Sequence, residues 1–201
     1  MLVGVVAALA SPTRIKVMAS CPGSERWDIK TLTDTGPSGA GSVHFSPIVD
    51  TTVSALRADA PSAPIGASTP RLVVERTVYR VTAKLVEAET VYTAGSMKGD
   101  EDIHLVISEP GHPTLKMIAE FPKGGCIPES NSAKASKMDK ARAAFVKICG
   151  APPLGHFKTL HGTATITGVG FFDKKHPTPQ RGRAPHDREL HPVLSFSATS
   201  C

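Results

Sequence analysis

Residues 102–122, "DIHLVISEPGHPTLKMIAEFP", carry the pattern that decides the fold. Apolar and polar residues alternate on both sides of a Pro/Gly loop, which predicts a hairpin of two strands, 102–108 and 114–122. Successive side chains of a strand point to opposite faces, so each strand has one apolar face. The side chains expected to enter a hydrophobic core are Ile103, Leu105, Ile107, Leu115, Met117, Ala119 and Phe121.

The segments around the hairpin predict further strands and a helix. Residues 71–92 alternate over a long span and are rich in Val, Thr and Tyr, which favours a strand, as do 162–173 and 189–198. Residues 132–149 favour a helix because of their Ala, Lys and Met content. Two sets of side chains are expected to be buried in the core. Tyr79, Val81, Ala83 and Leu85 recur at strand spacing, and Met138, Ala141, Phe145 and Ile148 recur at helical spacing.

The order of these elements predicts the fold class. Three strands, a helix and two more strands is the order of an OB-fold, a five-stranded, partly open barrel. We therefore predict a mainly β (α+β) chain in which residues 71–201 form a five-stranded OB-fold-like barrel with one helix. An unspecialised α+β domain is the alternative. Residues 21–70 are rich in Pro, Gly and Ser and predict an extended arm, with a short helix at 51–58 and Trp27 as its anchor.

The N-terminal residues 1–20 predict an export segment. Their apolar run is too short to span a bilayer as a helix and resembles the hydrophobic part of a secretory signal. The basic residues Arg14 and Lys16 follow this run instead of preceding it, so an uncleaved N-terminus is the alternative. The expected location is secreted or in the cell envelope, with no membrane span.

The four cysteines predict disulfides in an exported chain. Cys126 and Cys149 bracket the predicted helix, and Cys21 and Cys201 lie at the two ends of the mature chain. The nested pairing Cys126–Cys149 with Cys21–Cys201 is the simplest arrangement. A competing interpretation makes Cys21 a lipid-modified residue.

Charge and motifs limit the classes of function. The formal net charge of +5 and the pI near 9.1 favour an anionic partner, such as nucleic acid or an acidic glycan. The sequence has no nucleophile elbow, phosphate-binding loop or dinucleotide fingerprint, which argues against covalent hydrolases, kinases and dehydrogenases. We expect a monomer.

Polar side chains on the hairpin are candidate ligands of a divalent cation, Ca²⁺ or Zn²⁺. Asp102, His104 and Glu120 share the face opposite the apolar one and offer carboxylate and imidazole groups. The alternative is a solvated outer face of the barrel with no ligand.

The loop between the last two strands concentrates further acids, imidazoles and arginines. We expect Asp173, Glu189 and His191 to provide acid–base chemistry or to complete the cation site. The side chains expected to form an electropositive, ligand-binding rim are His176, Arg181, Arg183 and Arg188. The alternative is a charged surface hairpin. If there is one site, these groups and the hairpin ligands should converge.

Two resemblances accompany this interpretation. The chain contains "GVGFFD", followed by His176, Gln180 and "ELHPV", and, nearer the N-terminus, "ERWDIKTLTD" and "TTVSALR". In these motifs it resembles a family of secreted bacterial proteins without an assigned function. Pro185-His186-Asp187 stands where those relatives have Pro-Asn-Gly.

The hairpin is distantly similar to the calcium-binding hairpin of staphylococcal-type nucleases, which are OB-folds. The matching positions are Asp100, Asp102, Glu120 and Pro122. The resemblance implies a metal-dependent phosphodiesterase. The chain lacks two other residues of that family. Leu115 and Lys116 lie near the position of the family's arginine, and Lys123 lies near the position of its second glutamate.

Three functional hypotheses result. The first is a secreted, nuclease-like hydrolase that acts on a phosphodiester with a divalent cation. The second is a non-catalytic module that binds an anionic polymer, nucleic acid or glycan, on its basic rim. The third is an envelope protein whose partner is not encoded in a recognisable motif.

Overall fold

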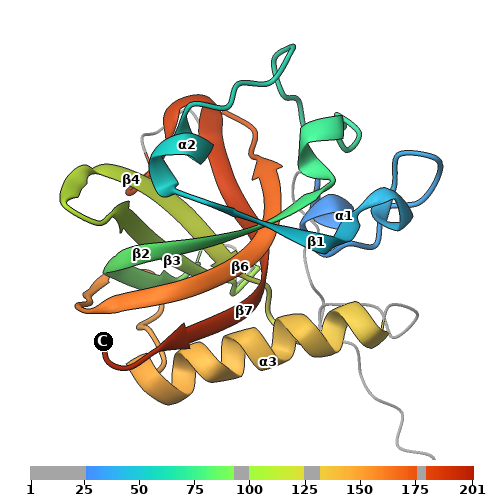
Figure 1. Ribbon diagram of the computed structural model, residues 1–201. Helices are drawn as coiled ribbons and strands as arrows, with labels where there is room; N and C mark the ends of the chain where they lie inside the picture. Colours follow the sequence, from blue (N-terminus) through green and yellow to red (C-terminus); the bar gives the residue numbers. More distant parts are fainter. Residues whose placement is uncertain (1–25, 93–99, 125–131, 176–179) are drawn as a thin grey trace, which may run out of the picture.

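The core is enclosed by strands that the alternating sequence patterns predict. The computed structural model describes residues 26–92, 100–124, 132–175 and 180–201 (Figure 1). The five long strands are β2 (Thr77–Thr90), β3 (Ile103–Glu109), β4 (His112–Phe121), β6 (Thr163–Phe172) and β7 (Arg188–Ala198). The predicted strands are confirmed, although the first begins later than residue 71, after the 3₁₀ turn η2 (Val73–Glu75).

Strand pairing closes these five strands into a ring. β3 pairs antiparallel with β2 and with β4, β4 pairs parallel with β7, and β6 pairs antiparallel with both β7 and β2. With β1 and β5, the sheet has seven strands within the described residues, and the fold is mainly β with helices, as expected for the α+β class. The expected core side chains of the hairpin are buried, apart from the partly buried Leu115.

The long helix α3 (Ser132–Cys149) covers one end of the ring, where it packs against β7 and β4 (Figure 1). Met138, Ala141 and Phe145 are buried, as their helical spacing predicts. The rings of Phe121, Phe145 and Phe196 contact one another, with centroids 5.2–5.8 Å apart. Ile148 was expected in the same stripe, but it is 37% exposed, and Cys149 occupies the buried position instead.

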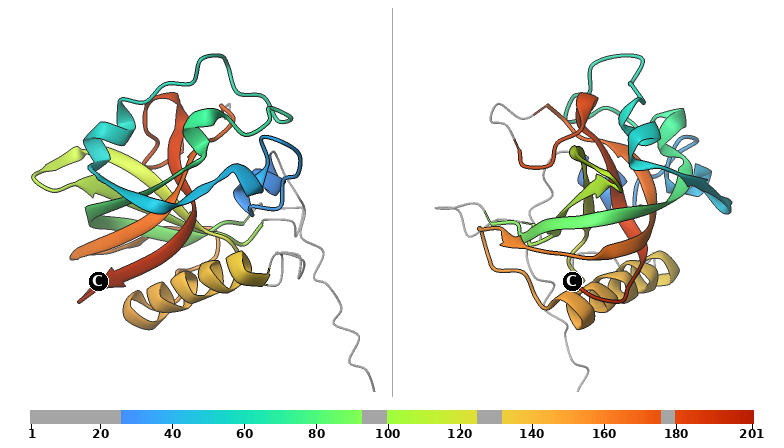
Figure 2. Two further views of the ribbon diagram at one scale, coloured as in Figure 1. Left: turned by 45° about the vertical axis from the view of Figure 1, so that its right-hand side comes forward. Right: turned by 60° about the vertical axis from the view of Figure 1, so that its left-hand side comes forward.

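The segment before the ring contains more structure than its composition predicts. The expected short helix is α2 (Val53–Arg57), which begins where the Thr52 side chain accepts a hydrogen bond from the Ala55 backbone N–H. α2 lies on the side of the ring away from α3 (Figures 1 and 2). The strand β1 (His44–Thr51), which was not expected, pairs parallel with β2 outside the ring. The other short elements are α1 (Trp27–Lys30), η1 (Ala40–Ser42), β5 (Lys158–Thr159) and η4 (Pro185–Asp187).

Arg26, rather than Trp27, holds the N-terminal segment against the ring. The Arg26 guanidinium donates to both carboxylate oxygens of Glu75 at 2.6 and 2.8 Å, and neither side chain is exposed. It also donates to backbone carbonyls, including that of Phe172 in β6. Trp27 is only partly buried. A guanidinium has five N–H donors and can bind several carboxylate and carbonyl acceptors at once, whereas an indole has one.

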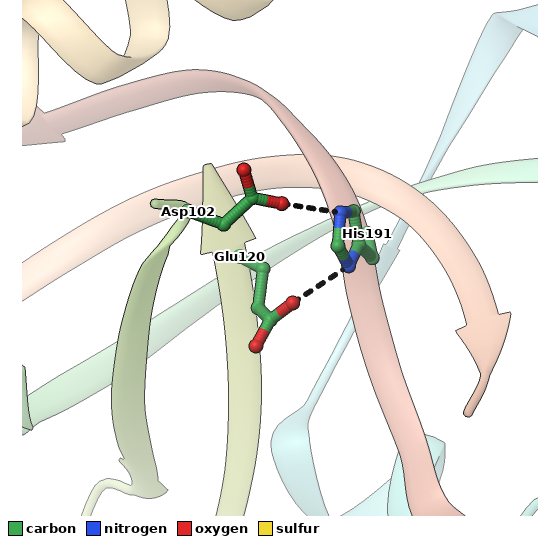
Figure 3. Close-up of side chains that lie close together, drawn as sticks. All are labelled: Asp102, Glu120 and His191. Carbon is green, nitrogen blue, oxygen red and sulfur yellow. Dashed lines mark ion pairs between the residues drawn. The ribbon is translucent and has the colours of Figure 1, made fainter. Parts of the chain in front are cut away.

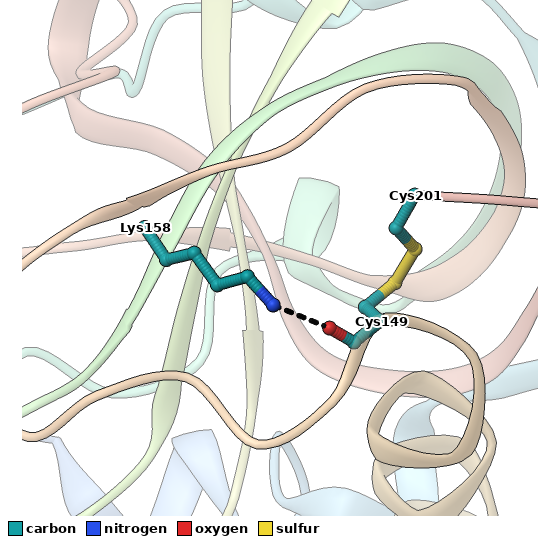
Figure 4. Close-up of a disulfide and its surroundings, with 3 residues drawn as sticks. All are labelled: Cys149, Lys158 and Cys201. Carbon is teal, nitrogen blue, oxygen red and sulfur yellow. Dashed lines mark hydrogen bonds between the residues drawn. A yellow bond between two sulfur atoms is a disulfide. The ribbon is translucent and has the colours of Figure 1, made fainter.

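A disulfide joins Cys149, at the end of α3, to Cys201, and the two Cα atoms are 5.1 Å apart (Figure 4). The nested pairing predicted from the sequence is therefore wrong, because it gave each of these cysteines another partner. The last residues of the chain follow β7 back toward the end of α3, which brings Cys201 to Cys149 (Figure 1). Cys21, Cys126 and the segment 1–20 lie outside the described residues. No described helix is long and apolar enough to cross a membrane.

Peptide mapping tests this pairing directly. A digest of the oxidised protein without reductant is expected to contain a peptide pair joined through Cys149 and Cys201, because the structure places these two Cα atoms at bonding distance. The Cys201→Ser variant should lose this pair and expose Cys149 to a thiol-alkylating reagent. Recovery of Cys149 joined to Cys126 would contradict the structure.

Candidate functional site

Three side chains from separate strands meet on the face of the sheet opposite the core: Asp102, Glu120 and His191 (Figure 3). Strand pairing explains the meeting. His104 lies directly across the ladder from Glu120, and the parallel pairing of Ala119 with Leu190 puts Glu120 beside His191. The three side chains are 0–9% exposed. The alternative of a solvated outer face therefore does not hold for these three side chains.

His191 lies between the two carboxylates. Its Nδ1 atom is 2.9 Å from Oε2 of Glu120, and its Nε2 atom is 3.4 Å from Oδ2 of Asp102 (Figure 3). The ligand atoms of these residues lie within 4.8 Å of one another. The other carboxylate oxygen of Asp102, Oδ1, accepts a hydrogen bond from the Lys123 backbone N–H at 2.8 Å. The arrangement offers two carboxylate oxygens and one imidazole nitrogen to a common point.

His104 contacts Glu120 from the other side. Its Nδ1 atom is 3.1 Å from Oε1 of Glu120, and its Nε2 atom is 3.1 Å from the carbonyl oxygen of Arg181. A carbonyl only accepts, so Nε2 carries a proton and Nδ1 faces the carboxylate. Burial acts to lower the pKa of His104, but Glu120 outweighs it and raises that pKa. His104 therefore orients Glu120 and stabilises its charge, rather than joining the three-residue group.

Two glutamates of the cluster have pKa values displaced in opposite directions. Burial acts to raise the pKa of Glu120, but His104 and His191 outweigh it and hold that pKa well below its usual range. Glu189 has an Oε2 atom 4.0 Å from Nδ1 of His191. Burial, together with the charges of Glu120 and Asp173, raises the pKa of Glu189 well above its usual range. The surroundings therefore favour the ionised form of Glu120 and the protonated form of Glu189.

Lys30, which the sequence analysis did not single out, supplies a buried positive charge to this cluster. Its ammonium group lies 3.5 Å from Oδ1 of Asp173 and 5.6 Å from the centre of the Phe171 ring. Burial acts to lower its pKa, but Asp173, Glu120 and Glu189 raise it further than burial lowers it. The only sequence signal was the location of Lys30 within the "ERWDIKTLTD" motif, because it has no spacing relation to the hairpin.

Several polar atoms of the cluster are buried without a hydrogen bond among the described residues. They are Oδ2 of Asp102, Oε2 of Glu189 and both ring nitrogens of His191. The contacts between His191 and the carboxylates are close but not aligned as hydrogen bonds. Buried polar atoms in native proteins are nearly always satisfied, so a group of them pointing at one another calls for a ligand. Carboxylate oxygens and an imidazole nitrogen are ligand types that divalent transition-metal ions accept in proteins.

The arginines expected to form an electropositive rim are paired within the protein. Arg181 contacts Glu87 at 2.8 Å, Arg183 forms an ion pair with Asp187, and Arg188 lies 3.0 Å from Asp59 and is buried. The fourth rim residue, His176, lies outside the described residues. The three described arginines of the expected rim are thus paired with carboxylates: Glu87 in β2, Asp187 in the same loop and Asp59 in the N-terminal arm.

A solvent-open hollow of about 330 Å³ borders the cluster through Asp173. It is also lined by Lys175, Arg183 and His186 from the same loop, and by prolines of the segment before β2. His186 and Asp187 adopt φ angles of 58° and 56°. They therefore hold the left-handed backbone that Asn-Gly would favour at this turn. The turn is thus formed without glycine. It positions the carboxylate of Asp187 to accept a hydrogen bond from Arg183.

Comparison with known proteins finds no matching family model, no matching curated protein and no matching solved structure.

Proposed function

We propose that the chain binds a divalent cation through Asp102, Glu120 and His191. The observation that carries the proposal is that ligand atoms of these three residues lie within 4.8 Å of one another, and that Oδ2 of Asp102 and both ring nitrogens of His191 are buried without a hydrogen bond among the described residues. An imidazole ligand favours zinc or a similar transition metal over calcium, which prefers oxygen ligands only. Of the ligands predicted from the sequence, this proposal keeps Asp102 and Glu120, and His191 replaces His104.

We also propose that the ring is an OB-fold-like barrel. The support is the order of elements, three strands, the helix α3 and two strands, together with the pairing of β6 with β2 and the parallel pairing of β4 with β7. In this architecture the helix follows the third strand and covers one end of the barrel. The Cys149–Cys201 disulfide supports the further proposal of a secreted or envelope protein, since disulfides persist in oxidising compartments.

The activity that fits this site best is metal-dependent hydrolysis of a phosphodiester. A bound cation polarises a phosphoryl group and activates water. The protein itself supplies a carboxyl group, Glu189, whose raised pKa favours its protonated form, and a buried cation, Lys30, which stabilises negative charge. Because the ligands are buried, we propose that substrate approaches through the hollow lined by Asp173, Lys175 and His186. Asp173 orients Lys30 there.

The binding-module hypothesis has less support. It relies on free positive charge, whereas Arg181, Arg183 and Arg188 contact Glu87, Asp187 and Asp59. Internal ion pairs reduce the counterion release that drives binding to anionic polymers.

Cation binding is tested by calorimetric titration of the chelator-treated protein with Zn²⁺, Mn²⁺ and Ca²⁺. We expect one Zn²⁺ per chain, bound more tightly than Ca²⁺, and at least a roughly 100-fold loss of affinity in Asp102→Asn, because a ligand and its charge are removed. His112→Gln changes an exposed histidine on the same strand as Glu120 and should bind like the wild type. Equal Zn²⁺ affinity in Asp102→Asn and the wild type would rule out the site.

Catalysis is tested separately on plasmid DNA and RNA, with Zn²⁺ or Mn²⁺ and with chelator. The expected result is cleavage that requires the metal and falls about 100-fold in Glu189→Gln, since general acid catalysis contributes factors of that order. Glu189→Gln should keep its cation. Metal binding without any cleavage would leave the cation site intact and refute the hydrolase.

A further inference from the structure

Arg188 is a buried cation that the proposed cation chemistry does not use. It is the first residue of β7, its side chain has no exposed surface, and it lies on the inner face of the ring with Leu190. Gly170 in the neighbouring strand makes room for it, because a Cβ atom there would lie 2.6 Å from an Arg188 nitrogen. A charged group in the interior of a closed sheet is costly unless it is paired or serves a ligand.

Aromatic rings hold the guanidinium in place but leave its N–H groups unused. The central carbon of Arg188 lies 4.6 Å from the centre of the Phe172 ring and 5.4 Å from that of Tyr79. Ring faces stabilise a cation without accepting its N–H bonds in the ordinary way. The Nε and both terminal nitrogens have no hydrogen bond among the described residues. The planar fork is thus oriented and buried, which favours recognition of an oxyanion.

Asp59 contacts this fork from the solvent side. Its Oδ2 atom lies 3.0 Å from an Arg188 nitrogen, and its side chain is 39% exposed. Asp59 follows α2 in the Pro/Ser-rich segment before β2, which has no strand pairing of its own. The hollow near the site is lined by Pro61 and by Asp187, close neighbours of Asp59 and Arg188 in the sequence. The Asp59 carboxylate therefore lies where an anion from solvent would reach the Arg188 guanidinium.

We propose that Arg188 is an oxyanion-binding residue and that the Asp59 carboxylate occupies its site in the free protein. The ligand class is a carboxylate or phosphate group small enough to take the place of the Asp59 side chain. A tethered carboxylate competes with a free ligand at a high effective concentration, so Asp59 lowers the apparent affinity for the ligand. The proposal does not depend on the cation site, since neither residue belongs to the group of Asp102, Glu120 and His191.

The test measures binding of inorganic phosphate, and separately of acetate, to the full chain in the presence of chelator. Asp59→Asn keeps the shape of the side chain and removes its charge. We expect Asp59→Asn to bind at least one of the two anions about tenfold more tightly than the wild type, and its thermal midpoint to rise on addition of that anion. The anion that binds identifies the ligand class.

Two further variants keep the outcome decisive. Asp50→Asn frees Arg80, whose ion pair is exposed (44% and 68% exposed side chains), and should gain no anion affinity. Adding Arg188→Lys to Asp59→Asn keeps the charge and removes the fork, and should lose most of the gained affinity. If Asp59→Asn binds neither anion better than the wild type, or if Asp50→Asn gains as much, Arg188 is structural and the proposal fails.

Discussion

Raising the pH from about 5 to about 8 is expected to lower the free energy of unfolding of the metal-free protein. Buried carboxylates and imidazoles of the cluster hold their protons more tightly in the folded state than in the unfolded state. Burial and the neighbouring Asp102 and Glu120 raise the pKa of Asp100 from 3.8 to about 7. Burial acts to lower the pKa of His191, but Asp102 and Glu120 raise it from 6.5 to about 8.

The sign follows from proton binding. A group whose pKa is raised by folding contributes stability that is complete below its unfolded pKa and is lost as the pH rises through its folded pKa. For His191 the loss spans 6.5 to about 8 and amounts to about 2 kcal/mol, at 1.36 kcal/mol per pKa unit. The raised pKa of Asp100 acts in the same direction between 3.8 and about 7, and the raised pKa of Glu189 has the same sign. Glu120 has the opposite sign, but its lowered pKa confines its effect to acid pH.

A bound cation should reverse this dependence. Metal ligands must be deprotonated, so cation binding strengthens as pH rises and stabilises the folded state more. Urea unfolding measured at several pH values between about 5 and 8, once with chelator and once with Zn²⁺, should therefore give slopes of opposite sign. His112→Gln, which changes an exposed histidine, should leave both slopes unchanged. Chelator-treated protein that grows more stable over this range would contradict the pKa assignments.

Glu75→Gln is expected to destabilise the protein by about 3–5 kcal/mol, the cost of leaving one member of a buried ion pair without its partner. Both side chains of the Arg26–Glu75 pair are fully buried, and Glu75 also accepts from the backbone N–H groups of Leu72 and Phe172. The amide keeps the size of the side chain but removes the negative charge. The Arg26 guanidinium would then be buried without compensation.

An exposed ion pair of the same chemistry provides the control. Arg80 and Asp50 are in contact at 2.5 Å, but their side chains are 44% and 68% exposed. Asp50→Asn should therefore change the free energy of unfolding far less than Glu75→Gln does, because water solvates both charges once the pair is lost. Denaturant unfolding of both variants and the wild type measures the difference. Similar losses in the two variants would show that burial does not set the strength of the Arg26–Glu75 pair.

Local periodicity was sufficient for the strands and the helix, because side-chain direction within an element depends only on spacing. Alternation identified β3 and β4, and the same parity placed Asp102, His104 and Glu120 together on the face opposite the core. The spacing of Met138, Ala141 and Phe145 identified the buried stripe of α3. β1 was missed because its pairing with β2 stabilises a segment whose own residues are mostly exposed.

The sequence by itself determined which residue types could form a site, and among them His191 contacts Glu120 of the hairpin at 2.9 Å. Only the tertiary structure decided which imidazole completes the group, because the parallel register of β4 with β7 places His191, and not His104, between the carboxylates. It also decided that Lys30 of α1 contacts Asp173 and that Cys149 pairs with Cys201. These contacts join residues far apart in the chain, so their partners depend on how the ring closes and not on any local pattern.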